Sequence, residues 1–295
     1  MSERVVVITG ASSGIGLACA TAVAQAGLVA VATARAPERA HALREAAEKV
    51  RSDCPGRIDI VRLDVTDPAS IAACVESIVD RYGRIDALVN NAGVAGANPS
   101  LEQCDLDDLR ASMEVNFFGV IAVSRAVMAH LRATGGRLIT ISSVRGVIGQ
   151  PFNEGYSAAK FAIEGFMEAL APVAAQVGVT VSLIEPAAVL DTEFVNNSSG
   201  PDPATLLAEA GPYEPAFRAY RRWVETGAIE GAQVAADVAD IVVRTLTVPQ
   251  PAFRIQTSAY GRRYVAGKLA DPDGGRIQEL LRSWVSTPNA TTNNL

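Results

Sequence analysis

Tyr156 and Lys160 are four residues apart in an alanine-rich segment, which predicts that both side chains lie on one face of a helix. A phenol beside an ammonium group is suited to proton transfer. The positive charge favours the phenolate and lowers the tyrosine pKa from its usual value of about 10. Such a tyrosine can act as a general acid or base near neutral pH. Ser143 follows a short apolar run, where it could hydrogen-bond the same substrate oxygen.

Taken alone, a tyrosine and a lysine at this spacing also fit a solvated helix face, so the rest of the chain must decide. Near the N-terminus, the apolar run 4–9 leads into a glycine-rich turn and an alanine-rich segment, which predicts a strand, a turn and a helix. Main-chain N–H groups of such a turn can approach a phosphate, and the helix N-terminus adds positive potential. The glycines of this predicted phosphate site are Gly10, Gly14 and Gly16.

Arg35 follows the second predicted strand, 28–33, at the position where dinucleotide-binding folds distinguish their cofactors. An acidic residue there binds the ribose hydroxyls of NAD, whereas an arginine accommodates the 2′-phosphate of NADP. The chain has Arg35 and no acidic residue before Glu38. We therefore expect NADP(H) in preference to NAD(H), the alternative being that Arg35 is merely solvated.

Apolar β-branched runs alternate with helical segments along the chain. This predicts an α/β fold with a single Rossmann-like, doubly wound parallel sheet of about seven strands and helices on both faces. Ligands of such sheets bind at the carboxyl ends of the strands. The predicted strands are 4–9, 28–33, 58–63, 86–89, 137–141, 179–184 and 253–256. Several candidate residues fall at strand ends: Arg35, Asp64, Asn90, Ser143 and Pro186.

The predicted organisation is one dinucleotide-binding and catalytic domain over residues 1–287, with a flexible polar tail at 288–295. Segment 187–231 follows a strand and contains several aromatic residues, which is typical of a substrate-binding lid. The helix that begins at Tyr156 is apolar on more than one face. We therefore expect one face to pack against another subunit, in a homodimer or homotetramer.

The composition of the 295-residue chain, 49% hydrophobic and 20% charged, is that of an ordinary globular protein. Its net charge of −6 argues against nucleic acid or an anionic membrane as a partner. We see no apolar run of about 18 residues and no signal-peptide pattern, so we expect a cytoplasmic protein without a membrane span. The four cysteines and two histidines lack ligand spacing, and no metal site is expected.

In combination, these motifs resemble those of the short-chain dehydrogenase/reductase family. The resemblance runs from residue 4 to about 192, and more loosely to about 256. It implies a catalytic tetrad in which Tyr156 is the general acid/base and Ser143 holds the substrate oxygen. Lys160 would bind the nicotinamide ribose and lower the tyrosine pKa, and Asn116 would hold a water in a proton relay. Asn116 also lies among apolar residues, so a structural hydrogen bond is the alternative.

The resemblance also implies which residues line the cofactor. They are Gly10, Ser12, Ser13, Gly14, Ile15, Gly16, Arg35, Asp64, Val65, Asn90, Ala92, Gly93, Tyr156, Lys160, Pro186 and Val189. The segment from Pro186 to Thr192 departs from the family pattern, with alanine after the proline and one residue more. The role of Thr192 towards the nicotinamide is therefore left open.

Segments 151–156 and 161–165 are similar to the branch that contains 17β-hydroxysteroid dehydrogenase type 1 and retinol dehydrogenases, which implies a bulky apolar substrate. The resulting hypothesis is an NADP(H)-dependent oxidoreductase that interconverts an alcohol and a ketone or aldehyde. One alternative is an NADP(H)-binding sensor or scaffold without catalysis, since a fold does not fix a function. The other is an epimerase or dehydratase on the same fold.

Overall fold

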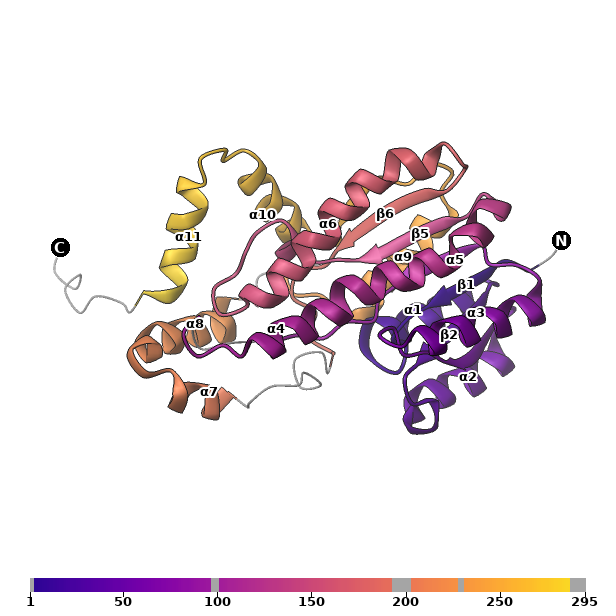
Figure 1. The fold of residues 1–295 in the computed structure, drawn as a ribbon, viewed down its shortest axis with the longest axis horizontal. Helices are drawn as coiled ribbons and strands as arrows, with labels where there is room; N and C mark the ends of the chain where they lie inside the picture. Colours follow the sequence, from indigo (N-terminus) through magenta and orange to yellow (C-terminus); the bar gives the residue numbers. More distant parts are fainter. Residues whose placement is uncertain (1–2, 97–100, 193–202, 228–230, 287–295) are drawn as a thin grey trace.

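Seven parallel strands form one sheet in the computed structural model, which describes residues 3–96, 101–192, 203–227 and 231–286 (Figure 1). The strand order is β3-β2-β1-β4-β5-β6-β7, so the direction of winding reverses between β1 and β4. This confirms the predicted doubly wound sheet and places a ligand crevice at the carboxyl ends of β1 and β4. The strands are β1 (Val5–Ile8), β2 (Val29–Ala34), β3 (Arg57–Arg62), β4 (Ala87–Asn90), β5 (Arg137–Ile141), β6 (Thr180–Glu185) and β7 (Arg254–Gln256).

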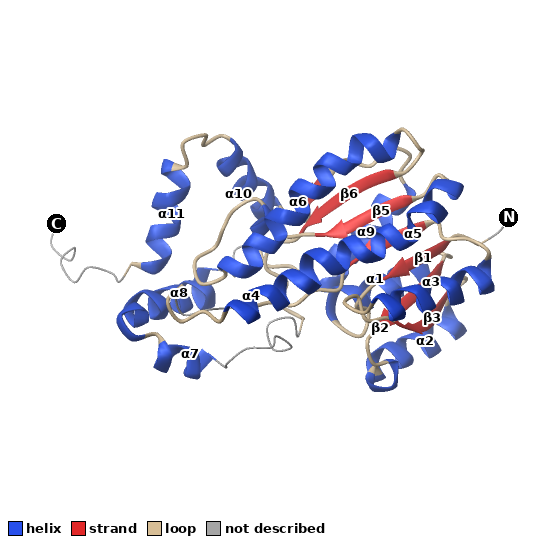
Figure 2. Cartoon of the chain, in the orientation of Figure 1, coloured by secondary structure: helices blue, strands red, loops and turns tan. Residues whose placement is uncertain are grey.

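Each face of the sheet is covered by three helices. One face carries α1 (Gly14–Gln25), α2 (His41–Asp53) and α9 (Ala235–Thr247). The other carries α3 (Pro68–Tyr82), α5 (Val120–Thr134) and α6 (Glu154–Ala175). Figure 2 shows these helices around the strands. Short 3₁₀ helices lie in the loops beside the sheet, among them η1 (Pro37–Arg39) and η3 (Val144–Gly146).

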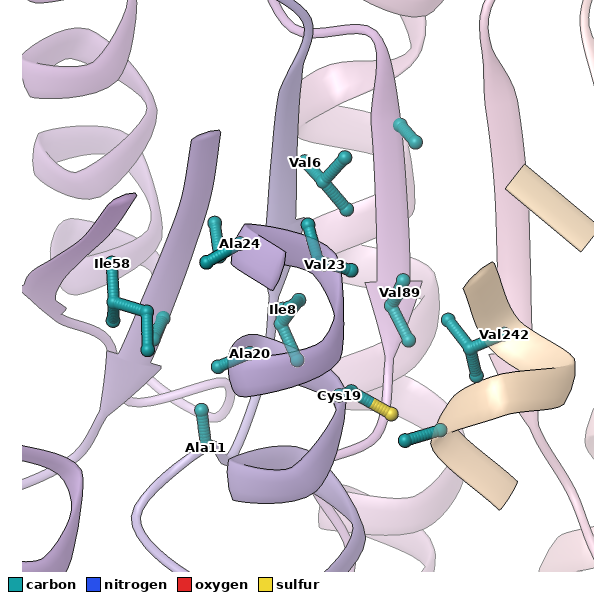
Figure 3. Close-up of a cluster of buried hydrophobic side chains, with 14 of the residues drawn as sticks. Val6, Ile8, Ala11, Cys19, Ala20, Val23, Ala24, Ile58, Val89 and Val242 are labelled. Carbon is teal, nitrogen blue, oxygen red and sulfur yellow. The ribbon is translucent and has the colours of Figure 1, made fainter. Parts of the chain in front are cut away.

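The residues of β1 show how the two faces are built. All four are buried, and successive side chains of a strand point to opposite faces. Val6 and Ile8 therefore join the core under α1, α2 and α9, and Val5 joins the core under α3, α5 and α6. Figure 3 shows part of the first core, where Cys19 and Val23 of α1 pack towards the strands. The alternation gives the sheet two hydrophobic cores that hold its strand ends in place.

One continuous helical segment runs through α4 (Leu106–Met113), a π-helical turn η2 (Glu114–Gly119) and α5. The π turn was not predicted from the sequence. By length and composition the stretch Leu106–Thr134 could cross a membrane, which differs from our expectation of no such helix. However, Val123, Val127 and Leu131 belong to the core against the sheet, as in a packed helix of a globular protein.

Four helices form a separate group, which we call the cap: α7 (Pro203–Glu209), α8 (Glu214–Gly227), α10 (Ala259–Leu269) and α11 (Gly275–Val285). A 3₁₀ turn, η4 (Gly211–Tyr213), links α7 to α8. Figure 1 shows α7, α8 and α11 together at one end of the molecule. Trp223 of α8 stacks on Trp284 of α11 with ring centroids 3.7 Å apart. The sequence did not predict α10 or α11.

The described part of the predicted lid, 187–192 and 203–227, contains α7 and α8. The rest of the lid segment up to residue 230, and the predicted tail at 288–295, lie outside the described residues. The single-domain boundary at residue 287 therefore stays a prediction.

Candidate active site

The turn after β1 fits only glycine at its closest points. Gly10 and Gly14 have φ angles of +66° and +53°, a region that residues with a side chain rarely adopt. A Cβ atom on Gly10 would lie 2.7 Å from the Cα atom of Ala92, and one on Gly16 would collide with the carbonyl oxygen of Gly10. The main chain is therefore packed tightly at the N-terminus of α1, where an anion is favoured.

The end of β4 is fastened to this turn across the reversal point of the sheet. The Asn91 side chain donates to the carbonyl oxygens of Thr9 and Gly10, at 2.9 and 3.0 Å. The Thr9 hydroxyl in turn accepts from the main-chain N–H groups of Asn91 and Ala92, both at 2.9 Å. Thr9 and Asn91 were not among the candidate site residues. Their signal was polarity at the ends of two apolar strands.

The other residues of the turn and of the β4 end have distinct positions. Ser12 is exposed, Ser13 caps α1 with extended backbone, and Ile15 packs against the core. Asn90 is 2% exposed, and its amide donates to Ser124 and Thr140 at 2.9 and 3.3 Å. The Asn90 side chain therefore makes structural hydrogen bonds in the protein interior, whereas Ala92 and Gly93 remain partly exposed at the strand end.

Arg35 is exposed directly after β2, as the sequence predicted. Strand register pairs Ala34 with Arg62, so a second arginine ends the neighbouring strand at the same edge. The pKa of Asp64 is lowered: burial opposes this, but hydrogen bonds from Thr66 and the charges of Arg35 and Arg62 outweigh it. Arg62 was not among the candidate residues, because only the strand register brings it beside Arg35.

Asn116 lies fully buried in η2 and is bonded on all sides. Its Oδ1 accepts from the N–H of Val94 at 3.1 Å. Its Nδ2 donates to the carbonyl oxygens of Val94 and Ser112 at 2.9 and 3.0 Å. The amide therefore joins the chain after β4 to the π turn, which is the structural bond left open by the sequence. Val65 packs against the same turn beside Gly119. A water-holding role for Asn116 stays a prediction.

Tyr156 and Lys160 lie one turn apart on α6, with the Lys160 Nζ 5.6 Å from the centroid of the tyrosine ring. Both side chains are buried, and the Lys160 ammonium donates to the carbonyl oxygen of Ile141 at 3.0 Å. Ser143, at the end of β5, hydrogen-bonds the Tyr156 side chain. The structure thus brings three of the four predicted catalytic residues together.

The expected lowering of the Tyr156 pKa by Lys160 is wrong for this structure. Burial raises the pKa of Tyr156, and the groups that act in the opposite direction are Arg145 and Ser143. Burial also lowers the pKa of Lys160 to about 8, against the charge of Glu164, which raises it. The sequence reasoning counted the charge of the lysine and left out the cost of burying both groups.

Two buried carboxyl groups lie behind Lys160. Glu164 follows one turn later on α6 and accepts from Arg254 of β7 at 3.0 Å. Glu185, fully buried at the end of β6, is 3.5 Å from the same guanidinium and accepts from Gln256 at 3.0 Å. Burial is the main cause that raises the pKa of Glu185, to about 7. This cluster was not predicted from the sequence, because its members come from separate elements.

The segment after β6 crosses the glycine turn. The Pro186 carbonyl oxygen accepts from the Val144 N–H at 3.1 Å and holds the Ser143 region. Val189 forms a bridge with Gln233. Thr192 then lies against Gly14, with its methyl carbon 3.2 Å from the place a Cβ there would occupy. Thr192 is thus beside the glycine turn, and its role towards the nicotinamide stays open.

These features fit a nicotinamide dinucleotide along the carboxyl edge of the sheet. The tight glycine turn offers main-chain donors to a pyrophosphate, the two arginines lie after β2 and β3, and the buried Tyr156 and Lys160 lie on the far side of the reversal point. The phosphates of such a cofactor would lie near the main-chain donors and the arginines, and its nicotinamide would lie near Tyr156 and Lys160.

Comparisons with known proteins agree with this geometry. The family model for short chain dehydrogenase matches residues 4–202. Estradiol 17-beta-dehydrogenase 1 of Rattus norvegicus is 35% identical over 285 residues, covering 95% of this chain and 81% of the relative. Retinol dehydrogenase 8 of Bos taurus is 35% identical over 286 residues, covering 92% of this chain and 87% of the relative.

Solved structures share the fold over most of the chain. A short-chain dehydrogenase from Streptomyces avermitilis is 29% identical with a TM-score of 0.74, covering 96% of this chain and 98% of its own. A metagenomic short-chain oxidoreductase in complex with NADP is 26% identical with a TM-score of 0.65, covering 86% and 95%. The chain therefore belongs to the short-chain dehydrogenase/reductase family, whose members are oxidoreductases that bind a nicotinamide cofactor.

Proposed function

We propose that this protein interconverts an alcohol and a ketone or aldehyde, with Tyr156 as the general acid/base. The observation that carries the proposal is the grouping of the buried Tyr156 and Lys160 with Ser143 at the carboxyl end of β5. When bound, the nicotinamide accepts or supplies the hydride. Ser143 holds the substrate oxygen, and Tyr156 gives a proton to that oxygen in reduction or takes one in oxidation.

The test of this chemistry is Tyr156→Phe, which keeps the ring and removes the hydroxyl. We expect turnover of any active carbonyl probe to fall at least ~100-fold, the lower end of the usual contribution of general acid–base catalysis. Tyr82→Phe is the matched control, because Tyr82 bonds Asp59 far from the site. Normal turnover by the Tyr156 variant would exclude the proposed mechanism.

The proposed cofactor is NADP(H) in preference to NAD(H). It is supported by the exposed guanidinium of Arg35 after β2 and by Arg62 at the neighbouring strand end, which suit a 2′-phosphate. We expect Arg35→Ala to weaken NADPH binding about tenfold and to leave NADH binding unchanged, as measured by titration. Arg51→Ala removes the same charge from the exposed end of α2 and serves as control. Equal loss for both cofactors would contradict the assignment.

The proposed substrate is bulky and apolar. Phe217 and Tyr220 of α8 form a buried apolar cluster with Phe152, which precedes the catalytic helix. Two relatives are named as dehydrogenases of estradiol and retinol, both of which are bulky apolar alcohols. A panel of apolar ketones and aldehydes of increasing size, with NADPH oxidation as readout, should show kcat/KM rising with size. The reverse order would exclude this substrate class.

The proposed assembly is a homodimer or homotetramer. Phe161 and Phe166 on α6 are 42% and 39% exposed, and Phe118 in the π turn η2 is 52% exposed. Phe117 packs edge-on against both Phe118 and Phe166, so these rings form one apolar surface. A second copy of the chain could cover it. Light scattering should show the oligomer, and Phe166→Asp should reduce the mass to that of one chain. A cytoplasmic location is proposed from the sequence alone.

A further inference from the structure

Arg145 lies in η3, two residues after Ser143, and its guanidinium faces the catalytic tyrosine. The Arg145 Cζ atom is 5.7 Å from the centroid of the Tyr156 ring. The Lys160 Nζ is at 5.6 Å from the same centroid. Two cations therefore reach one phenol from different elements, Lys160 from the helix of the tyrosine and Arg145 from the loop before it.

The position of Arg145 is fixed by a short chain of neutral groups. Its Nη1 donates to the Asn153 Oδ1 at 3.0 Å. The Asn153 Nδ2 donates to the Tyr220 hydroxyl of α8 at 2.8 Å, and both of these residues are more than nine-tenths buried. Because the partner of Arg145 is an amide rather than a carboxylate, this bond orients the guanidinium without cancelling its charge.

The two cations differ in the pH range over which they stay charged. Burial lowers the pKa of Lys160 to about 8, so its charge is lost in the range where a dehydrogenase would need phenolate. An arginine stays protonated at every working pH. A cation within roughly 6 Å of an acidic group favours the ionised form of that group. Arg145 therefore supplies a charge on which Tyr156 can rely when Lys160 cannot.

On the basis of the function proposed above, we propose that Arg145 is a positioning residue that keeps Tyr156 ionisable. Arg145 is itself held in place by Asn153, before α6, and through Asn153 by Tyr220 of α8. The cap thereby becomes part of the proton chemistry, since Tyr220 of α8 accepts a hydrogen bond from Asn153, and Asn153 in turn orients the cation that faces the general acid/base. Loss of the cap contact should then weaken the acid/base function before any substrate contact is changed.

Other groups close to Arg145 also affect the pKa of Tyr156 or interact with Arg145 themselves. Ser143 hydrogen-bonds Tyr156 and lowers its pKa, in the same direction as Arg145. Burial raises the pKa of Tyr220 of α8 and of Tyr264 of α10, and the charge of Arg145 acts on both in the opposite direction with a smaller effect. Glu154 at the start of α6 raises the pKa of Tyr220. None of these supplies a second permanent cation among the described residues.

The test is an alkaline titration of tyrosinate absorbance, with Tyr156→Phe subtracted so that only Tyr156 is followed. We expect Arg145→Gln to raise the midpoint of Tyr156 by about one pH unit, and Arg145→Lys to restore most of it. Tyr220→Phe should give a smaller rise in the same direction. Arg222→Gln removes a charge from the exposed side of α8 and should give no shift.

The outcomes separate this inference from the proposed function. An unchanged midpoint in Arg145→Gln, or a wild-type Tyr156 that does not ionise before alkaline unfolding, would overturn the role of Arg145. If Tyr156→Phe also keeps its turnover, the proposed function has failed instead. In oxidation of an apolar secondary alcohol that the wild type accepts, Tyr156 must be ionised to take the proton, so the acidic limb of kcat/KM should move with the titration midpoint. A rise in KM alone would mean that Arg145 contacts substrate rather than acting on Tyr156.

Discussion

The sheet and the cap are built from different kinds of side chain. The buried residues of the two sheet cores are aliphatic or small, without a buried aromatic ring among those described. The cap cores instead contain Phe152, Phe217, Tyr220 and Trp284, packed in stacked or edge-on pairs. Many small contacts fix the strand ends of the sheet, whereas a few large rings hold the cap. The cofactor edge is therefore set by backbone geometry, and the cap by individual side chains.

If the sheet depends on backbone fit, the largest effect should come from the smallest added group. Gly16→Ala puts a methyl group against the Gly10 carbonyl and the Asn91 amide, where the main chain cannot move aside. We expect a loss of about 4 kcal/mol in unfolding free energy and no measurable cofactor binding. Gly165→Ala is the control, because Gly165 is exposed on α6 with open space around it, and it should stabilise the protein slightly.

If the cap depends on single rings, Trp284→Ala should disrupt the cap and spare the sheet. The substitution removes the ring that stacks on Trp223 at 3.7 Å, and a buried tryptophan replaced by alanine costs about 3 kcal/mol. Hydrogen exchange should speed up in α8 and α11, while the amides of β1 and β4 keep their protection and NADPH still binds. Equal loss of protection in the strands would show that cap and sheet unfold as one unit.

The buried Glu185 at the end of β6 should make the unfolding free energy depend on pH. Burial raises the pKa of Glu185 from 4.5 to about 7, so the folded protein holds this proton more tightly than the unfolded chain. The stabilising contribution is complete below pH 4.5 and is lost as the pH rises through about 7. We expect Glu185→Gln to flatten this decline and to raise the unfolding free energy at pH 8 by about 2 kcal/mol. A variant with the wild-type decline would assign it to another group.

The smallest expected effect belongs to Asp67, the N-cap residue of helix α3, which packs on the sheet. The Asp67 Oδ1 accepts from the Ala69 N–H at 2.9 Å at the start of α3. Asp67→Ala should lower the unfolding free energy by about 1 kcal/mol, while Asp67→Asn should lose much less. Chemical denaturation measures both. A loss as large as that of Trp284→Ala would mean that single side chains matter as much in the sheet region as in the cap.

Sequence reasoning succeeded where the signal is local. The glycine turn and the pairing of Tyr156 with Lys160 depend on neighbours within a few residues, and the structure shows both of them. Strand periodicity likewise predicted all seven strands to within a residue or two at their ends. These features follow from backbone conformation and hydrophobic pattern, which are written in consecutive residues.

Other features depend on contacts between distant parts of the chain, and the sequence did not predict them. Trp223 and Trp284 are far apart in sequence, and neither α8 nor α11 has a glycine-rich or nucleotide-binding motif to mark it. The hydrogen bond from Asn153 to Tyr220 and the pairing of Arg62 with the end of β2 exist only after the elements pack. The direction of the Tyr156 pKa shift was wrong for the same reason, since burial is a property of the assembled structure.

The chain has two tryptophans, and both lie in the cap. Light absorbed by tryptophan is therefore emitted from α8 and α11 alone, and the stacked pair should also couple its transitions and give a strong near-ultraviolet dichroism signal. The wild-type protein thus contains its own optical reporter of cap position. Tryptophan fluorescence can therefore follow unfolding of the cap, without a dye or an added residue, while unfolding confined to the sheet edge would pass unseen.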